Sequence, residues 1–73
     1  MANFYDEEIT IDFPLPTVIQ NSIKECEKAD AENDLGTYLN WAEMVAEVLA
    51  KNAYGAGAIT KEQWILLQRK YHQ

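Results

Sequence analysis

Hydrophobic residues recur at steps of three and four along most of the chain, which is the spacing of amphipathic helices. The pattern predicts helices over residues 16–31, 35–54 and 60–71. Residues 1–15 precede them as an extended or short-strand arm. Because no repeat, low-complexity tract or linker divides the chain, we expect residues 1–73 to form a single, mainly α domain of three helices.

Within the arm, residues 9–13 alternate between apolar and polar side chains, which is the pattern of a short strand. The rest of the chain offers no second convincing strand, so a strand here would lack a partner for its backbone groups. Two interpretations stay open. Either the arm packs on the helices through Ile9, Ile11 and Phe13, or these residues add a strand to a partner protein or a second copy.

The central helix has the clearest hydrophobic pattern in the chain. The residues at the centre of its apolar arc are Tyr38, Ala42, Val45 and Leu49. Three further apolar side chains widen the arc on one flank: Trp41, Met44 and Val48. Because more than half of the helix circumference needs cover, the pattern predicts either a well-filled core or an interface with a partner.

Local signals mark the ends of the helices. Thr60 and Gln63 fit a capping box at the start of the third helix. Asn33 or Asp34 is placed to cap the central helix. Gly55 is placed to end that helix in the left-handed conformation.

The third helix has one clear inward face, formed by Trp64, Leu67 and Tyr71. Leu66 falls on the opposite side, among charged residues. We therefore predict that Leu66, together with its neighbour Ile65, is an exposed contact for a partner.

Residues 57–64 read Gly-Ala-Ile-Thr-Lys-Glu-Gln-Trp, and Lys70 follows six residues later. This segment resembles the Gly-x-Ile-Thr-x-Glu-Glu-Phe segment of SHOCT-type short C-terminal helical domains, with Gln63 and Trp64 in place of the second acid and the phenylalanine. The resemblance is limited to residues 57–70. Domains of that type are small helical hairpins associated with oligomerisation or tethering, so the resemblance implies an interaction role.

The chain offers little from which to build a reactive or metal-binding site. Cys26 is the only cysteine and His72 the only histidine, and they lie far apart in sequence, so we expect neither a disulfide nor a zinc site. No nucleophile with a partnered base stands out. We therefore expect a protein that is not an enzyme, with no catalytic residue, cofactor, metal or small-molecule substrate.

The start of the chain lacks the basic and apolar regions of a secretory signal, and no uncharged apolar run of about 18 residues occurs. We therefore expect a cytoplasmic protein with no membrane association. Charge is divided unevenly: residues 1–50 carry eleven acids against two bases, a net −9, and residues 51–73 carry one acid against four bases, a net +3. The overall net charge of −6 works against nucleic acid as a partner.

The leading hypothesis is a non-enzymatic protein–protein interaction module that forms a homo-oligomer or docks on a protein partner. The first alternative is an acidic inhibitor, immunity or nucleic-acid-mimic protein that binds a basic protein. The second is a DNA-binding protein similar to a helix-turn-helix protein, with the third helix as its recognition helix. The candidate interaction surface consists of Ile9, Ile11, Phe13, Trp41, Met44, Val48, Ile65 and Leu66.

Overall fold

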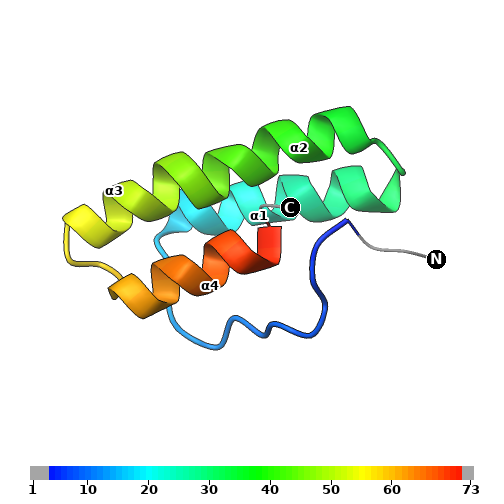
Figure 1. Cartoon of the computed structure of the whole chain (residues 1–73). Coiled ribbons are helices and arrows are strands. Elements are labelled where there is room, and N and C mark those ends of the chain that lie inside the picture. Colours follow the sequence, from blue (N-terminus) through cyan, green and yellow to red (C-terminus); the bar gives the residue numbers. More distant parts are fainter. Residues whose placement is uncertain (1–3, 72–73) are drawn as a thin grey trace.

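The computed structural model describes residues 4–71 and confirms the predicted fold class, a mainly α domain of three helices (Figure 1). Its elements are α1 (Thr17–Ala31), α2 (Leu35–Glu43), η1 (Met44–Leu49), α3 (Ala50–Gly55) and α4 (Lys61–Tyr71). Because α2, η1 and α3 follow one another without a break, they form one rod, which is the predicted central helix. No strand forms within residues 4–71, and residues 9–13 are irregular instead.

The rod lies at the centre of the packing. α1 packs along α2 and η1, whereas α4 packs along η1 and α3. Figure 1 shows the arm of residues 4–16 running along the edge of the molecule that faces away from the rod. The wide apolar arc of the rod is therefore shared between two helices that cover different stretches of it.

The core contains side chains from all three predicted helices. The largest fully buried side chains are those of Tyr38, Ile19, Leu67, Val45 and Cys26. The Tyr38 hydroxyl also donates a hydrogen bond of 3.3 Å to the carbonyl oxygen of Tyr71, which joins the rod to the end of α4. The predicted centre of the rod's arc is buried as expected, except that Leu49 is half-buried.

Asp34, one of the two predicted candidates, caps the start of the rod. Its carboxylate accepts a hydrogen bond from the Thr37 backbone N–H at 3.2 Å and one from the Thr37 hydroxyl at 2.8 Å. Asn33, the other candidate, has a φ of 56° and forms the left-handed turn after α1 instead. The short polar side chain of asparagine tolerates that conformation better than most residues do.

The stability of the protein is expected to fall in acid partly because the Asp34 cap becomes protonated. Hydrogen bonds from Thr37 lower the pKa of the Asp34 carboxyl below its usual value of 3.8. The stability that such a carboxyl contributes is present above the unfolded-state pKa and is lost as pH falls through the folded-state pKa. In urea unfolding, Asp34→Ala should be less stable than wild type at about pH 7, and the difference should narrow at about pH 3. An equal difference at both pH values would argue against this role.

The capping box at the start of α4 is confirmed. The Gln63 backbone N–H donates to the Thr60 hydroxyl oxygen at 3.1 Å, and the Thr60 backbone N–H donates to the Gln63 side-chain carbonyl at 2.8 Å. These two hydrogen bonds satisfy two donors that the first turn of a helix leaves unpaired. The start of α4 is therefore determined by its own sequence.

The prediction for Gly55 was wrong. Gly55 is the last residue of α3, and the left-handed residue is Gly57, with a φ of 79°. The Gly57 N–H donates to the carbonyl of Tyr54 at 3.0 Å, and the Ala58 N–H donates to the carbonyl of Ala53 at 2.8 Å. This pair of hydrogen bonds forms a Schellman motif. In this motif the residue whose N–H bonds to Tyr54 takes the left-handed conformation, so that residue is Gly57 and not Gly55.

The rod departs from α-helical geometry at η1, which is a π-helix. The Ala50 N–H donates to the carbonyl of Val45, five residues back, instead of that of Ala46, four residues back. The Ala46 carbonyl accepts a hydrogen bond of 3.0 Å from the indole N–H of Trp64 in α4. Trp64 thus replaces the α-helical donor to Ala46 and joins α4 to the widened turn.

Candidate interaction surface

Four neighbouring apolar side chains form a surface that we name the outer strip: Val18 of α1 and Trp41, Met44 and Val48 of the rod. Val18 is 55% exposed, Met44 40% and Val48 43%. Trp41 is half-buried and packs against the core. The three residues of the rod are candidates from the sequence, and Val18 is an addition from the structure.

The π-helical segment determines how Met44 and Val48 lie. Its hydrogen bonds span five residues, so side chains four or five positions apart share a face. Val45 and Ala46, from the same segment, are fully buried and take the side that faces the other helices. Met44 and Val48 therefore lie one above the other on the outer side of the rod.

A hollow lies between Val18 and Trp41. The residues that line it are Val18, Asn21, Ser22, Lys24, Glu25 and Trp41. Most of its surface is apolar, and two exposed side chains of opposite charge, Lys24 and Glu25, also line it. A hollow with these properties fits an aliphatic or aromatic side chain of a partner, which is how interfaces commonly anchor.

On α4 the exposed apolar side chain is Ile65, whereas Leu66 is half-buried. Lys70, four residues after Leu66, contacts the arm, so the arm passes close to this side of α4. The predicted exposure of Leu66 is therefore only partial. Ile65, at 40% exposed, is the better contact candidate on this helix.

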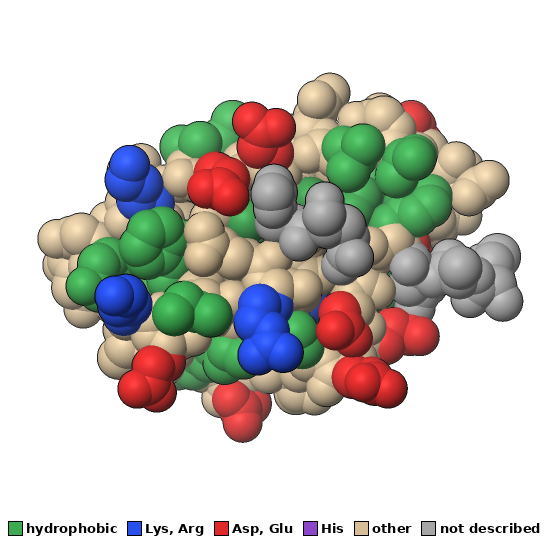
Figure 2. All heavy atoms as spheres, viewed as in Figure 1, with side chains coloured by type: hydrophobic (Ala, Val, Ile, Leu, Met, Phe, Trp, Pro, Cys, Tyr) green, Lys and Arg blue, Asp and Glu red, His purple; other side chains and the backbone are tan. Residues whose placement is uncertain are grey.

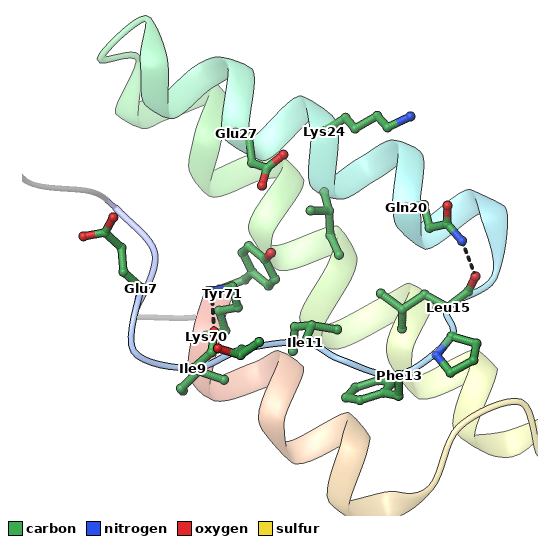
Figure 3. A pocket seen from close by; sticks show the side chains of 13 residues that line it. Glu7, Ile9, Ile11, Phe13, Leu15, Gln20, Lys24, Glu27, Lys70 and Tyr71 are labelled. Carbon is green, nitrogen blue, oxygen red and sulfur yellow. Dashed lines mark hydrogen bonds between the residues drawn. The ribbon is translucent and has the colours of Figure 1, made fainter.

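The arm candidates Ile9, Ile11 and Phe13 are half-buried, and Ile11 and Phe13 pack against the core. All three line a groove of about 520 Å³ between the arm and α1 (Figure 3). None of the outer-strip residues lines this groove. The candidates from the sequence are thus divided between the groove, the outer strip and α4, and do not form one continuous site.

Figure 3 shows the ring of Tyr71 between α1 and the arm, with Glu27 and Lys24 on the α1 side of the groove and Glu7 on the arm. The groove has the volume of a small-ligand site. Burial raises the pKa of the Tyr71 phenol, so the group stays protonated and neutral in the groove. The groove therefore combines apolar side chains with polar ones and with charged groups of both signs.

Lys70 joins the arm to α4. Its Nζ donates to the backbone carbonyls of Asp6 at 2.9 Å and Ile9 at 2.6 Å, and it lies 5.0 Å from the centroid of the Tyr5 ring. In return, the Asp6 N–H donates to the Lys70 carbonyl at 3.0 Å. The charge of Lys70 is therefore engaged within the molecule by carbonyl dipoles and aromatic rings.

The buried titratable groups are in their protonated forms at neutral pH. Burial, with the nearby Glu27 carboxylate, raises the pKa of the Cys26 thiol to about 12. Burial also raises the pKa of the Tyr38 hydroxyl. Because a nucleophile or general base must be able to lose its proton near pH 7, neither group suits such a role.

Within residues 4–71, no group of three or more His, Cys, Asp or Glu residues is placed to hold a metal ion. His72, which entered the prediction about zinc, lies outside the described residues. Across the same described part of the chain, none of the helices is both long enough and apolar enough to cross a membrane.

No protein-family model, curated protein or solved structure matches the chain. The resemblance of residues 57–70 to SHOCT-type domains therefore stays a prediction. A function has to be argued from the surface of the molecule and the chemistry of its residues.

Proposed function

We propose that this protein is a non-enzymatic protein–protein interaction module that docks through the outer strip. The observation that supports this most strongly is the exposure of Met44 and Val48 on successive turns of the rod, next to the half-buried Trp41. Single exposed apolar residues are normal on a protein surface. A row of neighbouring ones that includes methionine and tryptophan is typical of the centre of an interface.

The outer strip stays exposed although the rod is already packed by two helices. α1 and α4 cover the side that holds Val45 and Ala46. The apolar excess of the central helix is therefore only partly used in the core. Met44 and Val48 share one exposed face, and Leu35, Leu39 and Tyr54 are exposed outside the outer strip. A partner that covered Met44 and Val48 would remove these two apolar side chains from water.

The proposal predicts that charging the strip abolishes association without unfolding the protein. Met44→Lys with Val48→Lys places two ammonium groups at the centre of the proposed contact. Sedimentation equilibrium of the free protein, together with capture of a partner on immobilised protein, should show association for the wild type and none for this double variant. Circular dichroism should show unchanged helix content, because both side chains are exposed.

Leu39→Lys is the matched control. Leu39 belongs to the same rod and is 44% exposed, but it lies outside the outer strip. The Leu39→Lys variant should associate as the wild type does. Association that survives in the Met44/Val48 variant, or a wild-type protein that stays monomeric and captures nothing beyond bare resin, would contradict the proposal.

The acidic-inhibitor alternative is favoured by the net −9 of residues 1–50, and it predicts binding to a basic protein that weakens steeply with salt. The DNA-binding alternative relies on Arg69 and Lys70 of α4. Lys70 is engaged by the arm, which weighs against its contacting phosphates. A cytoplasmic location accords with each of these functions, and the resemblance of residues 57–70 to SHOCT-type domains supports an interaction role.

A further inference from the structure

The far end of the arm, residues 4–9, is held to the helices at two points. The Phe4 N–H donates to the Asp30 carboxylate of α1 at 2.7 Å. Lys70 of α4 holds the following residues, because its ammonium donates to two carbonyls of the arm and its own carbonyl accepts from the Asp6 N–H. Lys70 therefore takes part in each of these hydrogen bonds except that of Phe4.

The middle of the arm is separated from α1. Within the part of the chain that the structure describes, residues 10–13 form no hydrogen bond to the helices. The groove of about 520 Å³ lies between this stretch and α1, as Figure 3 shows. The contact of this stretch with the core consists of the side chains of Ile11 and Phe13. A segment with few buried contacts and unpaired backbone groups is held less firmly than a packed helix.

The arm meets α1 at a defined joint. Residues 14–16 read Pro-Leu-Pro, and Pro16 is extended, with φ −54° and ψ 147°, directly before α1 begins. Proline also restricts the residue before it to extended conformations, which keeps Phe13 and Leu15 out of the helix. The Gln20 side chain fixes the joint to α1, since it donates to the Leu15 carbonyl at 2.6 Å. A rotation ahead of this joint therefore moves the arm without unwinding α1.

The outer side of the arm faces water. Figure 2 shows acidic side chains along the lower edge of the molecule, where Figure 1 places the arm. Glu7, Glu8 and Asp12 of the arm are exposed. Because these carboxylates are hydrated whether or not the arm is attached, their solvation does not oppose its detachment.

The inner side of the arm covers two rings of the core. The ring centroid of Phe4 lies 5.2 Å from that of Tyr38, and the ring centroid of Tyr5 lies 6.0 Å from that of Tyr71. Tyr38 is fully buried, and Tyr71 is 2% exposed. Detachment of the arm would therefore uncover both tyrosine rings.

We propose that residues 4–13 form a strap that detaches from the three helices as one unit, with residues 14–16 as its hinge and Lys70 as the clip that holds it closed. The closed strap keeps the rings of Tyr38 and Tyr71 from solvent, and the open strap presents them. This device is separate from the proposed docking through the outer strip, because no outer-strip residue lines the groove under the arm.

Native-state hydrogen exchange of the wild-type protein tests whether the strap opens on its own. The amides of Phe4 and Asp6 should have protection factors that agree within about threefold and lie at least about tenfold below those of Ala42 and Leu67 in the helices. Low concentrations of urea should hardly change the exchange of the two arm amides, because detachment exposes much less surface than unfolding does.

Two substitutions test whether the strap moves as a unit. Lys70→Met should lower the protection of both Phe4 and Asp6 by about tenfold or more, because a hydrogen-bonded charge is lost. Asp30→Ala removes only the acceptor of Phe4, yet it should lower the protection of Asp6 as well. Helix content by circular dichroism should stay unchanged in both variants. Lys61→Met is the matched control, since it changes an exposed lysine at the opposite end of α4 and should leave both amides as they are.

The other outcomes overturn the inference. If Phe4 and Asp6 exchange as slowly as Ala42 and with the same dependence on urea, the arm leaves only when the whole domain unfolds. If Asp30→Ala lowers the protection of Phe4 alone, the arm frays residue by residue from its end. If Lys70→Met has no larger effect than the lysine control, Lys70 is not the clip. Loss of helix content in Lys70→Met would make the arm part of the core.

Discussion

Replacing Leu67 with alanine is expected to remove most of the stability of the protein. Leu67 lies in the core between α4 and the rod and is fully buried. Leucine-to-alanine changes at such sites cost about 2–5 kcal/mol, because the removed methyl groups leave a cavity. A single core in a domain of this size supplies only about 3–5 kcal/mol. Urea unfolding followed by circular dichroism measures the loss.

Leu66→Ala is the control for this experiment, because it removes the same atoms from the adjacent position of the same helix. Leu66 is half-buried, so its replacement should cost clearly less and leave a folded protein. An equal loss of stability at the two positions would mean that α4 is rotated from the orientation described. A larger loss at Leu66 would place that residue in the core.

Trp64→Phe is expected to destabilise the protein by about 1–2 kcal/mol, because it leaves the carbonyl of the buried residue Ala46 without the indole donor. Phenylalanine keeps an aromatic ring to stack on Tyr54, so most of the packing is retained. The measurement is again the free energy of unfolding in urea. Trp41→Phe is the matched control, because it exchanges the same groups at another half-buried position. If Trp64→Phe loses no more stability than Trp41→Phe, the hydrogen bond from Trp64 to the Ala46 carbonyl does not stabilise η1.

Much of the fold follows from local sequence. The spacing of apolar residues predicts all three helices, because tertiary packing needs one continuous apolar side on each of them. The capping box of Thr60 and Gln63 depends only on residues three positions apart, and so does the Asp34 cap. The Schellman turn was misplaced because Gly55 and Gly57 are both able to adopt the left-handed conformation. The choice between them depends on where the last turn of α3 ends.

The π-helical turn had no signal in the sequence. Residues 44–49 have the composition of an ordinary helix, and the hydrogen bond that accompanies the turn comes from the indole of Trp64, 18 positions away. Lys70 is a similar case. A lysine in the last turn of a helix normally faces water, and only the arm makes Lys70 a structural residue. Long-range contacts of this kind cannot be inferred from helical periodicity.

The candidate surface was predicted in part. Helical spacing alone placed Trp41, Met44 and Val48 on one flank of the central helix. It did not place Val18 beside them, because a wheel drawn for one helix does not show where the neighbouring helix ends its contact. Ile65 and Leu66 are adjacent, and their relative exposure depends on the path of the arm, which the sequence pattern leaves open.

The central claim is that the outer strip is a contact surface, and the methyl NMR spectrum of the wild-type protein tests it most directly. Between about 20 μM and about 1 mM, the methyl signals of Met44 and Val48 are expected to shift together, because association covers the outer strip. The methyl signals of Leu39 should stay in place. Constant positions for Met44 and Val48 over this range, in a protein that also captures no partner, would contradict the claim, and so would shifts confined to Leu39.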